Sequence, residues 1–155
     1  MTDHLGDYLE PEFLENKIYS SKAFLHKSYQ FKNEESKQRR FFILNQLPQE
    51  DDRIIIVNAT TKIQRREKAR RRQPKVLVRI PAGTRDYIPE DSIIDCESYA
   101  IWHKNKFKGM VKNGQIELLA PLPSEIMDKL YKAISHSRTI SDLDSRLVFS
   151  ENNDD

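Results

Sequence analysis

Glu34-Glu35-Ser36-Lys37-Gln38-Arg39-Arg40 leads into Phe41-Phe42-Ile43-Leu44-Asn45, and after an acidic turn the chain continues with Arg53-Ile54-Ile55-Ile56-Val57-Asn58-Ala59-Thr60-Thr61. Short apolar runs rich in isoleucine, valine and phenylalanine, bounded by polar turns, predict two buried strands of a small barrel rather than helices. If these strands pair, the arginines that begin the first and the threonines that end the second lie at the same edge. Cations that face hydroxyl groups there form the outline of an anion-binding site.

The composition predicts one soluble domain with a single core. The chain has 155 residues, of which 32% are charged and 37% hydrophobic, which is enough for one hydrophobic core. The net charge is only +2, but the bases crowd into residues 62–75 and the acids into the N-terminus, residues 50–52 and the tail. A local basic field is therefore more informative about partners than the overall charge.

Several classes of protein and site are not expected. The lone Cys96 excludes an internal disulfide and predicts a reducing, cytoplasmic location. No apolar segment approaches the roughly 20 residues of a membrane span, and the N-terminus lacks a signal-peptide pattern. Scattered histidines and one cysteine predict no metal site, and four unclustered glycines predict no phosphate loop. We therefore expect no metal and no cofactor.

We expect three segments along the chain. Residues 1–22 form an acidic N-terminal extension, residues 23–149 form the barrel domain, and residues 150–155 form a disordered acidic tail. Within the extension, residues 12–22 predict either a short helix or a flexible arm, and Phe13, Leu14 and Ile18 have no obvious place in the core. Strands are expected at residues 23–31, 41–45, 53–58, 76–80 and 92–102.

Turn and capping residues predict the remaining elements. Asn113-Gly114 predicts a hairpin between strands at 107–112 and 115–119, because both residues tolerate positive φ. Ser124 predicts the capped start of a helix at about residue 124, and Ser141 with Asp144 predicts the start of a last short helix. In that last helix we expect Leu143 and Leu147 to share a face.

Residues 62–75 are the compositionally extreme segment, with one acid, Glu67, among many bases. The segment predicts either an exposed loop or a helix with a basic face. Such a run either is solvated or contacts a polyanion, and the near absence of acids gives the second interpretation weight. The candidate contact residues are Lys62, Arg65, Arg66, Lys68, Arg70, Arg71 and Arg72.

Four segments resemble the MazF/PemK/Kid family of ribonuclease toxins. Residues 39–45 and 55–64 resemble two signature segments of that family, residues 91–97 its later strand, and residues 124–130 its C-terminal helix. The resemblance covers about residues 23–136 in the right order. It implies a mainly β fold, an SH3-like barrel with a C-terminal α-helix and short accessory helices, and it implies a homodimer.

The resemblance also implies a function. Family members cleave single-stranded RNA without metal, by attack of the 2′-hydroxyl on the adjacent phosphate, and an antitoxin protein is the usual partner. The basic run would then contact RNA. The family arginine falls on Arg39, or on Arg40 if the alignment shifts by one residue, and the family threonine falls on Thr60. The candidate catalytic residues are Arg39, Arg40, Thr60, Thr61, Glu34 and Glu35.

The chain also departs from the family pattern. Gln38 and Arg40 stand where glycine and proline are usual, and residues 98–103 replace a polar run that helps to bind RNA in the family. A catalytically silent barrel that binds nucleic acid or a protein partner is therefore the main alternative, and a purely structural interaction module is the third. The fold alone does not decide among them.

Overall fold

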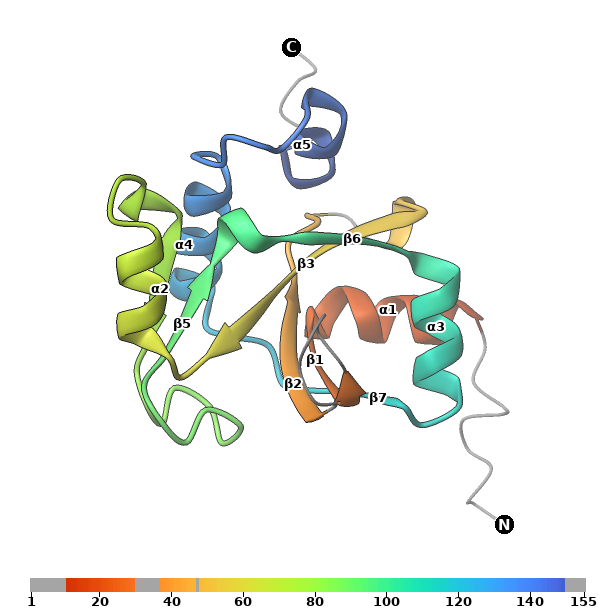
Figure 1. Cartoon of the computed structure of the whole chain (residues 1–155). Coiled ribbons are helices and arrows are strands. Elements are labelled where there is room, and N and C mark those ends of the chain that lie inside the picture. Colours follow the sequence, from red (N-terminus) through yellow and green to blue (C-terminus); the bar gives the residue numbers. More distant parts are fainter. Residues whose placement is uncertain (1–10, 30–36, 47, 150–155) are drawn as a thin grey trace.

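The computed structural model describes residues 11–29, 37–46 and 48–149. Their centre is an antiparallel sheet with helices on both sides (Figure 1). Within the described part of the chain the strand order is β4-β5-β3-β2-β1-β7, and β6 also pairs with β3. The strands are β1 (Ala23–Tyr29), β2 (Lys37–Ile43), β3 (Arg53–Thr60), β4 (Leu77–Ile80), β5 (Ser92–Asp95), β6 (Ala100–His103) and β7 (Ile116–Leu118).

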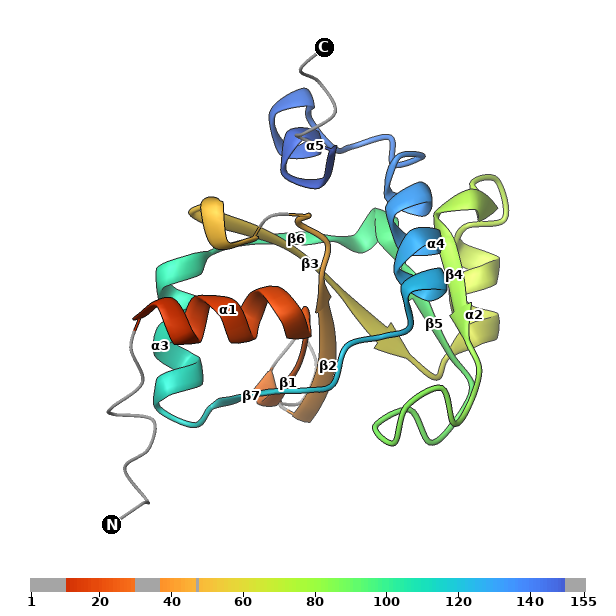
Figure 2. The ribbon, with the colours of Figure 1, turned by 180° about the vertical axis from the view of Figure 1, so that it is seen from behind.

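Helices cover the two ends of the sheet. Near β1, β6 and β7 lie α1 (Pro11–Ser21) and α3 (Lys104–Lys112), whereas α2 (Ile63–Ala69) and α4 (Ser124–Ile134) flank β4 and β5 (Figures 1 and 2). The last helix, α5, spans Asp142–Phe149. Among the described residues there are also three short 3₁₀ helices: η2 (Pro48–Glu50), η3 (Pro74–Val76) and η4 (Cys96–Ser98).

Both faces of β2 and β3 are buried, because alternate side chains enter different core clusters. Phe42 and Val57 pack in one cluster with the apolar face of α4, which includes Leu130. Phe41 and Ile56 pack in the other, together with residues of α1, β1, α3 and β7. The continuous apolar runs seen in the sequence thus belong to strands covered on both sides.

Strand β3 pairs with β2 and with β5 through different parts of its length. Its middle pairs with β2 up to the pair Phe41–Asn58, while its last residues pair with β5 through Ala59–Ile94 and Thr60–Ile93. Within the described residues, the β2–β3 pairing stops before the end of β3. The start of β2 and the end of β3 therefore separate and leave an opening between them.

The structure confirms part of the predicted fold class. The antiparallel sheet and the helix after Pro123 are present, but the described chain is mixed α/β rather than mainly β. Its sheet is open, since the end strands β4 and β7 are not paired with each other in the described residues. The basic run accounts for part of the difference, because α2 forms within it.

The predicted hairpin at Asn113-Gly114 is wrong, because the segment before the turn is a helix and only the segment after it is a strand. Residues 104–112 form helix α3, whose Phe107, Met110 and Val111 meet the second core cluster. Asn113 is the C-cap of α3, and Gly114 has φ +86°. An Asn-Gly pair with a left-handed glycine is as suitable for ending a helix as for a tight hairpin, and the helical apolar spacing decides between them.

Of the two helix starts predicted from capping residues, the structure confirms the cap at Ser141 but not the one at Ser124. The N–H of Asp144 donates to Ser141 Oγ at 3.0 Å, as the predicted cap requires. Helix α4, however, has Pro123 as its N-cap residue, and Ser124 is already in the first turn. Leu143 is 61% exposed, so α5 buries Val148 instead of a Leu143 and Leu147 face.

Helix α1 confirms the helical alternative for residues 12–22. Its Ile18 is 1% exposed and packs in the second core cluster, so the expectation that it has no place in the core is wrong. Residues 1–10 of the predicted extension and residues 150–155, the predicted tail, lie outside the described residues. No helix in the described ranges is long and apolar enough to cross a membrane.

Candidate functional site

A cleft of about 600 Å³ opens where the start of β2, the end of β3, α2 and the loop before β5 meet. It lies at the point where β3 leaves β2 for β5, so the divergence of the two pairings creates it. Its lining residues are Lys37, Gln38, Arg39, Arg40, Asn58, Ala59, Thr60, Thr61, Lys62, Arg65, Arg66, Tyr87, Ile88, Pro89, Glu90, Ser92, Asp95 and Ser98.

The cleft is strongly basic on one side. Six of its lining residues are lysine or arginine and two are acidic. One of those acids, Asp95, accepts from arginines, so it does not act as a free negative charge. Concave basic surfaces concentrate anions by focusing the electrostatic potential.

The two candidate arginines lie within strand β2 and not in the preceding loop. Arg39 pairs with His26 and Arg40 with Leu25 across β1. Neighbouring strand residues point to opposite faces, so Arg40 shares the face of Phe42, and Tyr87 packs on Phe42 with 6.3 Å between ring centroids. Both arginines line the cleft, and they approach it from opposite faces of β2.

Arg40 carries a donor that an anion would satisfy. Its Nε atom is buried and has no hydrogen-bond acceptor among the described residues. Buried polar atoms in folded proteins nearly always have a partner, and leaving one without a partner costs about 1–3 kcal/mol. A bound phosphate oxygen would supply the missing acceptor, because guanidinium groups bind phosphates through charge-assisted hydrogen bonds.

The candidate threonines end β3 at the same cleft. The backbone N–H of Lys62 donates to Thr60 Oγ1 at 3.2 Å. Because that oxygen accepts a bond, the hydroxyl hydrogen remains available to donate to an anion. Thr61 lines the cleft too and is exposed. The structure thus brings Arg39, Arg40, Thr60 and Thr61 together, whereas Glu34 and Glu35 lie outside the described residues.

The basic run divides into groups with different surroundings. Lys62, Arg65 and Arg66 line the cleft, whereas the remaining candidates do not. Arg66 and Arg70 both bind Asp95. The candidates that are exposed and outside the lining are Lys68, Arg71 and Arg72. Not every predicted contact residue is therefore directed to the cleft.

Asp95 holds helix α2 against the sheet. Its side chain is 4% exposed, and one oxygen, Oδ2, lies 3.0 Å from Arg66 Nη1 and 2.8 Å from Arg70 Nε. Ser98 Oγ donates to the same oxygen at 3.2 Å. Two guanidinium groups on one carboxylate leave a local excess of one positive charge, and Arg66 lines the cleft.

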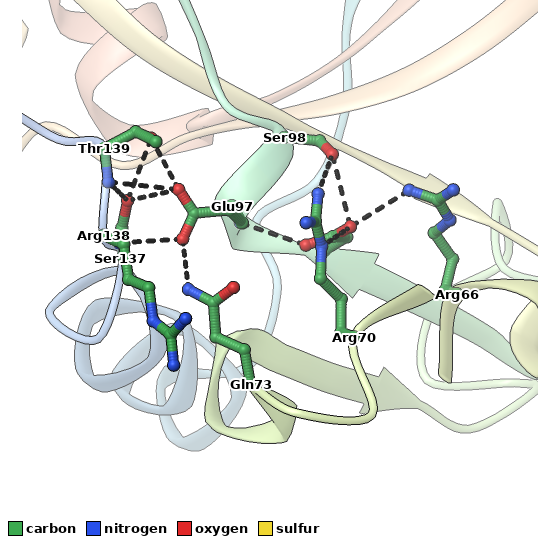
Figure 3. Close-up of polar contacts among 9 residues, drawn as sticks. Arg66, Arg70, Gln73, Glu97, Ser98, Ser137, Arg138 and Thr139 are labelled. Atoms are coloured by element: carbon green, nitrogen blue, oxygen red, sulfur yellow. Dashed lines mark hydrogen bonds and ion pairs between the residues drawn. The ribbon is translucent and has the colours of Figure 1, made fainter. Parts of the chain in front are cut away.

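Glu97 holds a different part of the structure. Its carboxylate accepts from the Gln73 amide, the Ser137 and Thr139 hydroxyls, and the backbone N–H groups of Arg138 and Thr139 (Figure 3). Burial opposes ionisation of Glu97, but these hydrogen bonds outweigh it and lower the pKa of the carboxyl. Glu97 thus connects η4 to the loop that follows α4.

Two further groups near the cleft have shifted pKa values. Burial raises the pKa of Tyr87 to about 12, partly offset by Arg85, so its hydroxyl stays protonated and donates to Ala120 O at 2.7 Å. Burial, with the charges of Asp95 and Glu97, raises the pKa of the Cys96 thiol. Cys96 is buried and free, and a thiol kept protonated is a poor nucleophile.

Sequence reasoning missed several cleft residues. Lys37 and Asn58 lay within recognised segments, and their positions in the strands explain their presence in the lining. Asp95 falls within the strand expected at residues 92–102, but the sequence gives no sign of its role, because its partners are 25 and 29 residues away. Tyr87 gave no signal, since a single tyrosine in a loop forms no pattern.

Comparisons with known proteins add no family assignment. No model of a known protein family matches the chain, and no curated protein matches it. In the described ranges, no group of three or more histidine, cysteine or acidic side chains is placed to hold a metal ion. The resemblance drawn from the sequence stays a prediction, and the geometry of the cleft is the basis for assigning a function.

Proposed function

We propose that the protein binds single-stranded RNA in this cleft and cleaves it as a metal-independent endoribonuclease of the toxin type. The single observation that carries the proposal is the meeting of Arg40 and Thr60 at one cleft. Arg40 brings a buried Nε without an acceptor among the described residues, and Thr60 brings a hydroxyl free to donate. Both are suited to phosphate oxygens.

The proposal includes a place in the MazF/PemK/Kid family and its SH3-like barrel. The change of partner along β3, from β6 at its start to β5 at its end, supports this finer description, because strands that change partner let a small sheet turn a corner. With the family come a homodimer, an antitoxin partner and a cytoplasmic location. These belong to the proposal and rest on the sequence resemblance.

The proposed reaction needs no group beyond RNA and protein. The 2′-oxygen loses its proton and attacks the adjacent phosphorus, forming a new P–O bond. The bond from phosphorus to the 5′-oxygen breaks, and that oxygen takes up a proton, which leaves cyclic phosphate and 5′-hydroxyl ends. Arg39, Arg40 and Thr60 would stabilise the extra negative charge on the non-bridging phosphate oxygens, and Glu34 or Glu35 would accept the first proton.

A catalytically silent RNA-binding barrel is the second candidate, and the cleft lining favours keeping it. The lining carboxylates in the described residues are Glu90 and Asp95, and no histidine lines that part of the cleft. Asp95 is bound by two arginines, and Glu90 is exposed. Asp95 is thus occupied by its arginine partners and is not available to accept a proton from RNA.

The test is to incubate the purified protein with a long single-stranded RNA in EDTA and to map the new 5′ ends. We expect cleavage that leaves 5′-hydroxyl ends, and we expect Arg40→Ala to slow it ~100- to 1000-fold, by analogy with oxyanion-stabilising donors. Arg138→Ala is the matched control, because the Arg138 side chain is exposed and does not line the cleft.

The outcomes separate the candidates. Full cleavage by the Arg39→Ala/Arg40→Ala double variant would remove both arginines from the mechanism. RNA binding by the wild-type protein without any cleavage supports the silent barrel. If the protein neither binds nor cleaves RNA, both candidates are rejected.

A further inference from the structure

The cleft has two unlike sides. On one side are basic groups and hydroxyls from β2, the end of β3 and α2. On the other, in the loop that precedes β5, are Tyr87, the buried Ile88 and the exposed Pro89, followed by the exposed acid Glu90. A site for phosphate alone needs only the first side, so the aromatic and apolar side requires a different explanation.

Tyr87 is held in a fixed position at the cleft. Its hydroxyl donates to Ala120 O at 2.7 Å, and its ring packs on Phe42 with 6.3 Å between centroids and 35° between planes. The residue is half-buried, so part of its surface remains accessible, whereas the neighbouring Pro89 is exposed. A ring fixed from two directions loses little conformational entropy when a ligand packs on it.

We propose that Tyr87, with Pro89 beside it, forms a subsite for an unpaired nucleobase. A nucleotide joins a flat, largely apolar base to a charged phosphate, which matches the two sides of this cleft. Aromatic side chains beside basic grooves bind successive bases of single strands by stacking. The inference rests on the RNA binding proposed above but does not depend on cleavage.

The subsite restricts the class of substrate. In a duplex the bases are stacked within the helix and their faces are not accessible, so a stacking subsite selects single strands, loops or frayed ends. Polyanions without bases would meet only the basic side of the cleft. We therefore expect the protein to distinguish single-stranded RNA from a chain of equal charge that lacks bases.

The experiment compares two ligands of the same length and charge in fluorescence binding assays. One is a 2′-O-methyl oligouridylate, which has no 2′-hydroxyl to react, and the other is the same backbone without bases. We expect the wild-type protein to bind the base-bearing strand about 5- to 150-fold more tightly, the range that stacking of one base gives. Tyr87→Leu, which keeps an apolar side chain but no ring, should reduce this ratio toward one.

A matched variant distinguishes the contribution of the Tyr87 ring from that of its hydroxyl, which bonds to Ala120 O. Tyr87→Phe loses the hydroxyl bond to Ala120 but keeps the ring, so it should retain most of the preference for bases. An unchanged ratio in Tyr87→Leu, or equal binding of both ligands by the wild-type protein, would overturn the subsite while leaving phosphate binding intact. If neither ligand binds to the wild-type protein, it is the proposed function that fails.

Discussion

Asp95 and Glu97 are two residues apart, yet the structure stabilises their carboxylates with different kinds of partner. Asp95 is bound by the charged guanidinium groups of Arg66 and Arg70 from the basic run. Glu97 is bound by an amide, hydroxyls and backbone N–H groups, with the last of these from the loop after α4. One carboxylate arranges charge beside the cleft, and the other joins parts of the scaffold.

The difference teaches how a basic segment can be both structural and functional. Without Asp95, the like charges of Arg66 and Arg70 would repel each other, and α2 has no buried residue of its own to hold it. With Asp95 in place, Arg66 is fixed at the cleft and the helix is fixed to β5. Glu97 has no comparable effect on the charge of the cleft, because it does not line it.

The largest effect should follow from removing Asp95. We expect Asp95→Ala to lower the free energy of unfolding by about 2–4 kcal/mol, somewhat less than a fully buried ion pair, because the arginine side chains are 30% and 25% exposed. For a chain of this size that corresponds to about 4–16 °C in Tm, measured by circular dichroism. Asp128→Ala, which removes an exposed acid from α4, should change Tm by about 1–2 °C at most. Equal shifts for the two variants would contradict a special role of Asp95.

The two arginines on Asp95 give a sharper test, because they share one acceptor atom but only Arg66 lines the cleft. Arg66→Gln should weaken RNA binding and reduce the slope of log affinity against log salt by ~0.7, the value for one phosphate contact on a single strand. Arg70→Gln should leave that slope unchanged. Because both arginines bind the same carboxylate oxygen, the two variants should lower the free energy of unfolding by similar amounts. If both variants change the slope equally, the basic run acts as a diffuse field rather than through residues placed at the cleft.

Local patterns in the sequence predicted the elements that local patterns determine. The apolar runs at residues 41–45 and 53–58 predicted β2 and β3, because apolar runs report burial directly, and the serine at position 124 predicted the start of α4 to within one residue. The Asn113-Gly114 pair was misread, since the same two residues can end a helix or form a hairpin turn. Helical packing of Phe107 on the core decided the outcome.

The candidate site was predictable only where it belongs to those same strands. Arg39, Arg40, Thr60 and Thr61 meet at one cleft because the antiparallel pairing brings the start of β2 near the end of β3. The separate roles of Arg66 and Arg70 were not predictable, because their common partner Asp95 lies on a distant strand. Composition gives the charge of a helix, but only the fold shows which of its charged side chains form ion pairs within the protein.

The smallest effect should be the response of Glu97 to acid. The pKa of Glu97 is lowered in the folded protein, so the unfolded chain binds the proton more readily. The stabilisation is therefore fully present above the ordinary glutamate pKa of about 4.3, and it is lost as pH falls through the lower, folded pKa. We expect the difference in Tm between the wild-type protein and Glu97→Gln to be constant from about pH 7 to pH 5 and to shrink below about pH 4. Thermal unfolding at a series of pH values measures this difference.

RNA affinity at pH 7 should be unchanged in Glu97→Gln, since the residue does not line the cleft. A loss of RNA affinity as large as that of Arg66→Gln would show that the two carboxylates act on one site, which would remove the contrast between them.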